Sequence, residues 1–280
     1  MKIGLAFHAT DLAMPPVELA REAEVRGFHS LYIPEHTHIP SSRRTPAPTG
    51  SAELGEEYRR TPDPYVTIGA MAAVTRRLRL GTGIALVAQH DPIALAKAIA
   101  TADWLSGGRV VLGIGYGWNH EEMENHGVDP RRRRAHVREV MLALQALWSE
   151  EEASYDGDFV RFEPSWMLPK PVQQPRPPVL LGGAPGPTLF RHIAEYADGW
   201  MPIGGAGMRR ALEDLQRAME ERGRDFGALE LVPFGVLPDP GKLDYYREAG
   251  MTEVALRIPS APRDTVLPAL DACVRYLEKG

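Results

Sequence analysis

Segments that favour strands alternate with segments that favour helices along nearly the whole chain, and this order constrains the fold more than any other feature. Short aliphatic and β-branched runs are each followed by a stretch with apolar residues at helical spacing. We predict strands at residues 2–7, 30–33, 78–87, 109–118, 179–182, 200–203, 229–234 and 254–258. We predict helices at residues 15–26, 64–75, 92–105, 131–148, 188–197, 208–221, 243–248 and 263–277.

Roughly eight strand–helix units in one chain are typical of an α/β protein with a barrel of parallel strands. We therefore predict a single (β/α)8 TIM barrel domain over residues 1–280. A doubly wound sheet is the alternative, and it would carry a Gly-x-Gly-x-x-Gly run after its first strand. No such run follows Phe7.

Two insertions are expected in this barrel. Residues 37–63 follow the second strand without sustained periodicity and are too long for an ordinary connection, so they form either a lid or a disordered excursion. Leu54 and Tyr58 are four residues apart, so a short turn within this loop can dock onto the barrel mouth. Asp156-Gly157 between strand-like flanks predicts a small hairpin before the fifth strand.

Composition excludes several classes of partner. The net charge of -5 argues against a general nucleic-acid binder, which usually has a basic balance. No apolar stretch approaches the ~20 residues of a membrane span, so no membrane partner is expected. The single cysteine, Cys273, cannot form an internal disulfide, and a reducing cytoplasm is the expected location.

An acid–histidine pair, Glu35-His36, stands directly after the second strand. Pro34 has no N–H group to give to a strand ladder, so pairing ends there. Ligands bind at the carboxyl ends of parallel strands in α/β proteins, which places this pair well for chemistry. A loop histidine beside a solvated glutamate is the alternative interpretation.

Glycines are concentrated at three other strand ends, in residues 81–84, 113–119 and 181–188. Glycine lets a flat ring or a phosphate approach the backbone amides. The third run leads into a helix, whose free N-terminal amides favour an anion. For Gly81, Gly83, Gly113 and Gly115, packing inside a barrel is an equally good explanation.

Other polar residues favour simpler interpretations. His38, His90 and His120 lie near predicted strand ends, but no ligand spacing connects them, and we predict no metal site. His8 on the first strand is expected to form a hydrogen bond in the core or pocket. The arginines at 131–134 are expected to form a solvated helix face.

Several of these motifs, in this order, resemble the luciferase-like flavin and deazaflavin oxidoreductases along nearly the whole chain. The motifs are Pro34-Glu35-His36, Leu80-Gly81-Thr82-Gly83-Ile84, Asp103-Trp104-Leu105-Ser106-Gly107-Gly108-Arg109, Gly113-Ile114-Gly115-Tyr116-Gly117-Trp118, Pro178-Val179-Leu180-Leu181-Gly182-Gly183 and Ala197-Asp198-Gly199-Trp200. The combination is similar to the branch that uses coenzyme F420, a 5-deazaflavin, although relatives with FMN share much of it.

The resemblance implies roles for single residues. His36 would lie beside the reactive ring and give or take a proton, with Glu35 orienting or tuning it. A non-proline cis peptide between Gly83 and Ile84 would support the back of the ring. The implied cofactor contacts are His36, Gly83, Ile84, Gly115, Trp118, Asn119, Gly182, Gly183, Ala184, Gly186 and Thr188. The cofactor phosphate would bind the amides of the last glycine run.

One departure from the family pattern concerns the substrate. Some deazaflavin dehydrogenases have an acidic residue just after the fourth-strand glycines, whereas this chain has Trp118-Asn119. A sugar-phosphate dehydrogenase role is therefore disfavoured. For the arginines at 131–134, an alternative to a solvated helix face is that they bind the anionic tail of a deazaflavin.

The resulting prediction is an F420-dependent oxidoreductase that transfers hydride to or from a small organic substrate. An FMN-dependent monooxygenase that uses O2 and a separate flavin reductase is the alternative within the same class. A cofactor-binding protein without turnover is the alternative of another class, because resemblance defines a fold better than an activity. The resemblance also implies a homodimer, with helices of the first half in contact.

Overall fold

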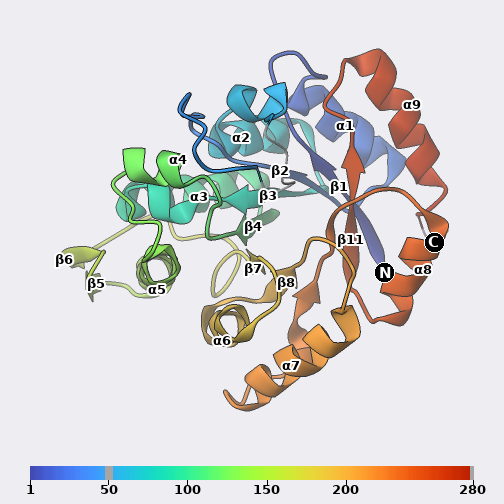
Figure 1. The fold of residues 1–280 in the computed structure, drawn as a ribbon. Coiled ribbons are helices and arrows are strands. Elements are labelled where there is room, and N and C mark those ends of the chain that lie inside the picture. The colour runs from blue at the N-terminus through green and yellow to red at the C-terminus, as the bar shows by residue number, and fades with distance from the viewer. Residues whose placement is uncertain (48–52, 278–280) are drawn as a thin grey trace.

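A curled sheet of parallel strands forms the centre of the computed structural model (Figure 1). The structure describes residues 1–47 and 53–277. Within these residues the sheet has nine strands, and every neighbouring pair is parallel. Their order is β10 (Phe234–Val236), β11 (Glu253–Ile258), β1 (Lys2–Phe7), β2 (Ser30–Ile33), β3 (Arg79–Ala85), β4 (Val110–Ile114), β7 (Val179–Gly182), β8 (Gly199–Met201) and β9 (Glu230–Leu231). The prediction of an α/β fold with a parallel sheet is confirmed.

The two outermost strands of the sheet, β9 and β10, are adjacent in the chain, with only Val232 and Pro233 between them. The amide of Phe234 donates to the carbonyl of Pro202, just beyond β8, at 2.8 Å, and the amide of Ala255 in β11 donates to the carbonyl of Pro233 at 2.9 Å. This segment therefore bonds to both ends of the sheet. The strand predicted at 229–234 is divided here because proline has no N–H group.

Apolar side chains cover both faces of the strands. In β2, Leu31 and Ile33 belong to a large cluster shared with the helices, whereas Tyr32 between them belongs to a separate cluster inside the curled sheet. Neighbouring residues of a strand point to opposite faces, so a strand buried on both faces has no polar alternation. The inner cluster contains Ala6, Tyr32, Val111, Leu180, Met201, Val232 and Ala255.

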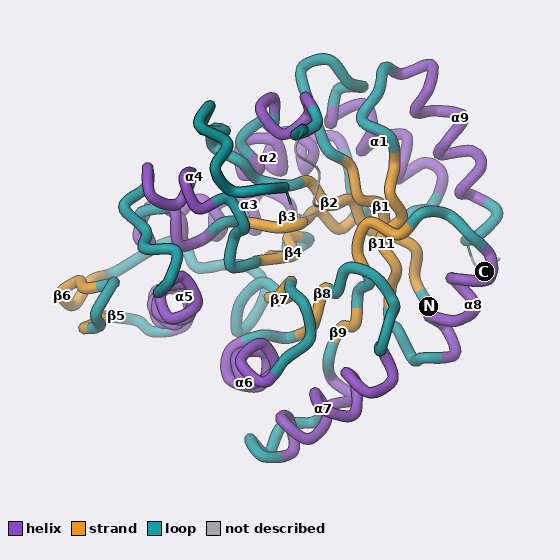
Figure 2. The backbone as a smooth tube through the Cα atoms, viewed as in Figure 1, coloured by secondary structure: helices purple, strands orange, loops and turns teal. Residues whose placement is uncertain are grey.

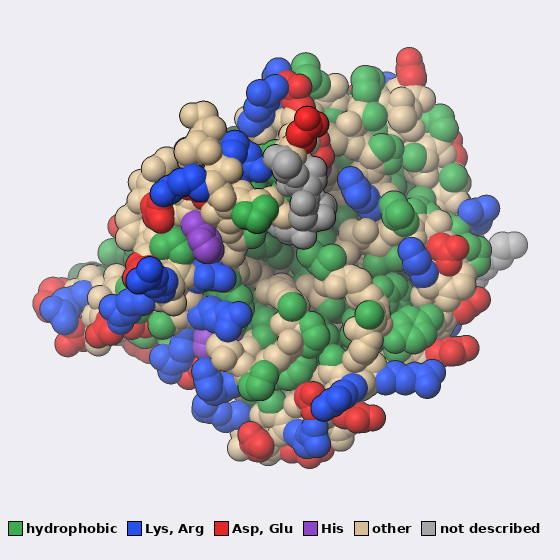
Figure 3. Space-filling view, in the orientation of Figure 1, with side chains coloured by type: hydrophobic (Ala, Val, Ile, Leu, Met, Phe, Trp, Pro, Cys, Tyr) green, Lys and Arg blue, Asp and Glu red, His purple; other side chains and the backbone are tan. Residues whose placement is uncertain are grey.

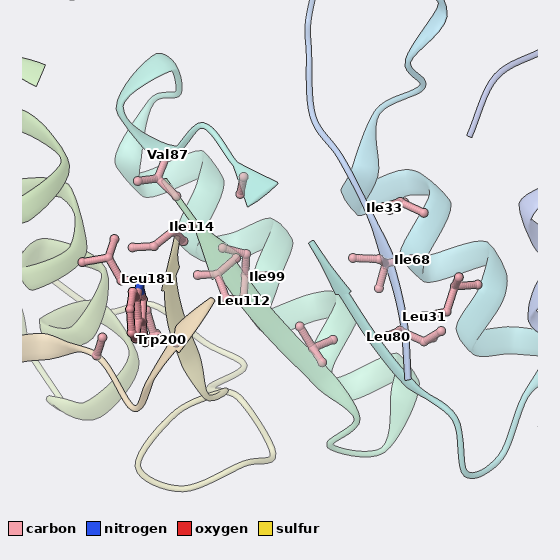
Figure 4. Packing of buried hydrophobic residues seen from close by; sticks show 14 of the residues in the cluster. Leu31, Ile33, Ile68, Leu80, Val87, Ile99, Leu112, Ile114, Leu181 and Trp200 are labelled. Atoms are coloured by element: carbon pink, nitrogen blue, oxygen red, sulfur yellow. The ribbon is translucent and has the colours of Figure 1, made fainter. Parts of the chain in front are cut away.

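Helices lie outside the strands (Figure 2). They are α1 (Pro16–Arg26), α2 (Pro64–Val74), α3 (Pro92–Ser106), α4 (His120–Asn125), α5 (Arg133–Ser149), α6 (Pro187–Tyr196), α7 (Met208–Glu220), α8 (Pro240–Glu248) and α9 (Arg263–Val274). Asp63 and Asp91 cap α2 and α3 by accepting from the amides of Val66 and Ala94, each at 2.8 Å. Figure 4 shows Ile68 of α2 beside Leu31 and Ile33.

Smaller elements fill the connections. Strands β5 (Ala153–Asp156) and β6 (Arg161–Ser165) pair antiparallel, so the predicted hairpin forms. The loop after β2 contains a 3-10 helix, η1 (Glu56–Arg60), while residues 48–52 of the predicted lid lie outside the described residues. Two short 3-10 helices, η2 (Val87–Gln89) and η3 (Phe226–Ala228), follow β3 and α7.

Two predicted strands are shorter than expected. The strand predicted at 78–87 ends at Ala85, and the one predicted at 109–118 ends at Ile114. Helix α4 was not predicted. It begins where Asn119 acts as its N-cap, with the side-chain oxygen 3.5 Å from the amide of Glu122. The glycine-rich stretch between Ile114 and Asn119 is therefore a loop at a strand end, and not an extension of the strand.

In the part of the chain that the structure describes, no helix is both long and apolar enough to cross a membrane. Cys273 lies buried on α9 with a free thiol. The cytoplasmic location stays a prediction.

The space around two glycines, one in the sheet and one on a helix, predicts how each responds to substitution. A Cβ on Gly113 of β4 would overlap the carbonyl oxygen of Thr82 in the neighbouring strand, whereas a Cβ on Gly69 of α2 would meet nothing within 4 Å. We expect Gly113→Ala to destabilise the protein by about 1–3 kcal/mol because the strands must move apart. Gly69→Ala should stabilise it by about 0.5–1 kcal/mol through helix propensity. Urea denaturation measures both, and equal effects would contradict the packing described here.

Candidate active site

His36 lies three residues beyond the end of β2, and its side chain is buried. Its Nδ1 atom is 2.7 Å from Oε2 of Glu122, a fully buried residue of α4. The other carboxylate oxygen of Glu122 accepts from the amide of Thr37 at 3.2 Å. A carboxylate accepts and cannot donate, so the proton of a neutral His36 ring is on Nδ1 and Nε2 keeps its lone pair. Glu122 therefore sets both the orientation and the tautomer of this histidine.

Glu35 does not orient His36, which was one of the two roles predicted for it, and the tuning of His36 by Glu35 stays a prediction. Its Oε2 accepts from the amide of Leu86 at 2.6 Å, and its Oε1 lies 2.7 Å from Nε2 of His90. Both carboxylate oxygens of Glu35 therefore bind the segment that follows β3. The residue that orients His36 is Glu122. Burial lowers the pKa of His90, but the hydrogen bond and charge of Glu35 outweigh this and raise the pKa. Glu35 ties the end of β2 to the segment that follows β3.

Two aromatic rings, those of Tyr58 and Trp118, lie beside His36 at the strand ends. The ring centroid of Tyr58, from η1, is 5.6 Å from that of His36 and 5.0 Å from that of His8. The ring of Trp118 is 5.7 Å from His36 and 6.1 Å from Tyr58. Nε2 of His8 lies 2.9 Å from the hydroxyl of Thr61, so the predicted hydrogen bond of His8 forms. The loop after β2 therefore contacts the strand ends through Tyr58, and its function as a lid stays a prediction.

The predicted cis peptide between Gly83 and Ile84 is present. A Cβ on Gly83 would overlap the ring of Phe234, and a Cβ on Gly115 would lie 2.5 Å from Cδ1 of Ile84. Packing against the ring of Phe234 therefore explains the glycine at 83, whereas the contact at Gly115 is with the flexible end of the Ile84 side chain. Ile84 itself is only half-buried, beside the strand ends. Contact of Gly83, Ile84 and Gly115 with a cofactor stays a prediction.

The third glycine run connects β7 to α6 and is more open. Gly182 and Gly183 are half-buried, Ala184 is exposed, and a Cβ on Gly186 would meet nothing within 4 Å. Helix α6 begins without a side-chain cap, and its first residue is proline. The amides of Thr188 and Leu189 in the first turn have no partner within the helix. Such a terminus with free amides suits a phosphate group.

Basic side chains lie near this terminus. In Figure 3, Lys and Arg side chains gather on the left of the central hollow and below it, over the region of α4, α5 and α6. Within the predicted solvated run, Arg132 pairs with Asp158 at 2.7 Å and Arg134 lies 5.5 Å above the ring of Tyr116. Nε of Arg133 is buried without a hydrogen-bond partner among the described residues. The run is therefore only partly a solvated face.

The side chain of Asn119 has one atom that is bonded within the protein and one that is available to a ligand. Its side-chain oxygen caps α4, while its Nδ2 atom is buried and has no hydrogen-bond partner in the described part of the chain. A buried amide donor without a partner is costly unless something else accepts its hydrogen bond. Trp118 beside it is half-buried.

Glu122 is the site residue that our sequence reasoning missed. The signal was present, because Asn119-x-x-Glu122 is a pattern of a helix N-terminus, which would have placed a carboxylate at the end of β4. Tyr116 and His192 were missed as well. Their side chains join the β4 loop to α6, with the hydroxyl of Tyr116 2.9 Å from Nδ1 of His192. Among residues 1–47 and 53–277, no group of three or more His, Cys, Asp or Glu is placed to hold a metal ion.

The carboxyl ends of the strands in a parallel α/β sheet are where ligands bind, and the buried pair of His36 and Glu122 lies there. The sequence profile described as luciferase-like monooxygenase matches residues 13–237. The chain belongs to this family and is an oxidoreductase. The alternative of a binding protein without turnover is therefore not kept.

Three proteins illustrate what this chain is similar to. An uncharacterised protein of Mycobacterium tuberculosis is 47% identical over 267 residues, which are 94% of each chain. The F420-dependent glucose-6-phosphate dehydrogenase of Kineococcus radiotolerans is 28% identical over 245 residues, covering 82% of this chain and 66% of that protein. The crystal structure of monooxygenase RslO1 from Streptomyces bottropensis superimposes with a TM-score of 0.78 over 99% of this chain and 98% of that chain, at 22% identity. The last similarity shows a common fold.

The buried histidines predict how stability depends on pH. Burial lowers the pKa of His8 to about 4, and the nearby His36 adds to this effect. Burial also lowers the pKa of His29 and of His192 to about 4. The unfolded chain binds these protons near pH ~6.5, whereas the folded chain binds them only near 4. The stability is therefore fully present above pH ~6.5 and is lost as the pH falls towards 4.

We expect the free energy of unfolding, measured with urea, to fall between pH 7 and pH 5. His8→Gln removes one of the three groups and should reduce this fall, because glutamine does not titrate. His120→Gln, at an exposed position, is the matched control and should leave the fall unchanged. The same fall in His8→Gln as in the natural protein would contradict the prediction.

Proposed function

We propose that this protein is an F420-dependent oxidoreductase that transfers hydride to or from a small organic substrate. The observation that carries the proposal is the buried pair of His36 and Glu122 at the strand ends, near the cis peptide of Gly83 and Ile84. The name of the Kineococcus relative supports the deazaflavin. When bound, the deazaflavin supplies a ring carbon that accepts or donates a hydride.

The residues present fit such a cofactor. The open backbone at Gly186 and the free amides at the start of α6 would hold a phosphate, together with the amide of Gly183. The buried, unpartnered Nδ2 atom of Asn119 would donate a hydrogen bond. Ile84, half-buried, would support the ring.

The phosphate site would include Ala184, whose exposed position leaves its backbone open to a ligand. Gly182 and Gly183 precede it at the end of β7, and the carbonyl of Gly183 is held by the indole N–H of Trp200 at 3.1 Å. This hydrogen bond fixes the start of the loop against β8. A loop that is already ordered binds an anion at a lower cost in conformational entropy than a mobile one does.

His36 would exchange the proton that accompanies hydride transfer. With Nδ1 held by Glu122, its Nε2 atom is the atom left to take a proton from a substrate hydroxyl or to return one to a carbonyl. The carboxylate of Glu122 stabilises the imidazolium that forms. Tyr58 and Trp118 cover His36 and would exclude water from the reacting atoms.

An FMN-dependent monooxygenase remains the second candidate function. The similarity of the fold to that of monooxygenase RslO1 favours it. In that case a separate flavin reductase would supply the reduced cofactor. A deazaflavin has a carbon in place of one ring nitrogen of a flavin, and the O2 chemistry of the flavin ring needs that nitrogen.

We also infer the finer architecture. The curled sheet is proposed to be a (β/α)8 barrel in which β9 and β10 count as one strand, interrupted at Pro233. Residues 1–280 are proposed to form one domain. The hydrogen bonds of this segment to both ends of the sheet support the closed barrel.

The choice of cofactor is tested by fluorescence titration of the purified protein with oxidised F420 and with FMN. We expect tighter binding of F420. Equal affinities, or tighter binding of FMN, would overturn the choice of F420 and favour the monooxygenase.

The phosphate site is tested with Gly186→Val. Gly186 has an extended backbone with φ of 166° and open space around it, so valine should leave the fold intact. Its branched side chain would occupy the space of the phosphate, and we expect cofactor affinity to fall by about tenfold or more. Gly183 suits this test less well because its φ of 152° strains any side chain. Gly69→Ala is the control, and unchanged affinity in Gly186→Val would mean that the phosphate binds elsewhere.

The predicted homodimer is tested by sedimentation at micromolar concentration. Trp104 and Leu105 of α3 are 58% and 56% exposed, which is unusual for large apolar side chains and supports a contact through helices of the first half. We expect a dimer, and we expect the double variant Trp104→Lys, Leu105→Glu to be monomeric. Val274→Lys on α9 should remain dimeric. A monomeric natural protein would contradict the prediction.

A further inference from the structure

Arg257 of β11 lies on the inner face of the curled sheet. It pairs in register with Ala6 of β1, and paired residues of parallel strands point to the same face. Ala6 and Ala255, the latter two residues before Arg257, both belong to the inner apolar cluster. Arg257 stands next to the last residue of its strand and is exposed, unlike these two alanines. Its side chain therefore extends from the inner face towards the carboxyl ends of the strands.

The guanidinium of Arg257 has no acidic partner among the residues that the structure describes. Within residues 1–47 and 53–277, no ion pair or hydrogen bond joins it to another side chain, whereas Arg79 and Arg176 pair with Glu230 and Asp198. Glu57 is the acidic residue of η1 that affects the same neighbours, His8 and Tyr58, yet it forms no ion pair with Arg257. An arginine on the inner face of a sheet, without a counter-ion, is suited to a negatively charged ligand.

Exposed apolar side chains occur in the loops that follow several strands of the sheet. Leu12, Ile203 and Leu237 follow β1, β8 and β10, and they are 58%, 82% and 56% exposed. The half-buried ring of Phe234 lies inside the sheet, in edge contact with Tyr32. Burial lowers the pKa of His8 to about 4, so this neighbouring ring is neutral at pH 7 and adds no second positive charge.

We propose that Arg257 binds the carboxylate of the substrate, and that the substrate is an organic acid with an apolar body. The proposal rests on the proposed function, because it places the substrate at the same strand ends as His36. A single guanidinium fork matches one carboxylate with two parallel hydrogen bonds. A phosphate dianion would favour a second cation, and both arginines of η1 already have acidic partners: Arg59 pairs with Glu56, and Arg60 pairs with Asp11 and Glu56.

The positions of Arg257 and His36 also indicate the size of the substrate. Arg257 is on β11 and His36 follows β2, with β1 between these two strands. Two strand spacings are about 10 Å, so the carboxylate and the reacting carbon are separated by several bonds. The exposed apolar side chains at the strand ends would contact the carbon chain between them.

Calorimetric titration of the full-length protein, with and without F420, tests this proposal. The probes are hexanoate and hexanamide, which share size and shape and differ in charge. We expect hexanoate to bind about tenfold more tightly than hexanamide, because only the carboxylate forms a charge-assisted pair. Arg257→Gln should abolish this preference, and Arg257→Lys should retain part of it, since lysine keeps the charge but not the fork. Arg210→Gln, an exposed arginine of α7, is the matched control and should keep the full preference.

Several results would overturn the proposal: equal affinity for the two probes, no binding of hexanoate at about 10 mM, or a preference that survives in Arg257→Gln. Displacement of hexanoate by inorganic phosphate at a lower concentration would overturn the assignment to a carboxylate. Circular dichroism measures whether each variant is folded. If Arg257→Gln is not folded, the reduced preference for hexanoate in Arg257→Lys tests the proposal instead. Arg257-dependent binding of hexanoate in a protein that binds neither F420 nor FMN would disprove the proposed function and leave this inference standing.

Discussion

The narrow space inside the curled sheet is the constraint on which the rest of the structure depends. Strands apolar on both faces must be covered by helices on one side and by each other on the other side. At Gly113 and Gly199 a Cβ would overlap the carbonyl oxygens of Thr82 and Glu230 in the neighbouring strands. Such glycines let the backbones approach, and the large inner side chains, Tyr32 and Phe234, fill the space that remains. The curl brings the carboxyl ends of strands from both halves of the chain together.

Buried carboxylates hold the loops at those strand ends. Glu122 joins α4 to His36 and to the amide of Thr37, and Glu35 joins the end of β2 to Leu86 and His90. Glu121 accepts from the amides of Arg44 and Thr45 and from the hydroxyl of Thr45. Burial raises the pKa of Glu121, but these hydrogen bonds outweigh it and lower the pKa to about 2. Each carboxylate is satisfied by several donors, which makes its position well defined.

These contacts give two adjacent residues, Glu35 and His36, different functions in the structure. Glu35 and His36 are neighbours in the chain, but Glu35 bonds to the segment that follows β3, whereas His36 bonds to α4. The histidine receives its carboxylate from α4 and stays at the strand ends, while the glutamate stabilises the connection behind the cis peptide of Gly83 and Ile84. A pair that resembles one catalytic unit in sequence is therefore two structural units in space.

The sequence by itself determined the order of strands and helices apart from α4 and the division between β9 and β10, and it also determined the hairpin at Asp156-Gly157, the cis peptide and the place of His36. Each of these depends on local patterns or on a recognisable motif. The hydrogen-bond partners of the site residues could be seen only in the tertiary structure. His36 and Glu122 are 86 residues apart in the chain, and Glu35 and His90 are 55 apart. Local periodicity carries no information about such contacts, which arise when the sheet curls and strand ends meet. For the same reason, the inward position of Arg257 became visible only through its register with Ala6.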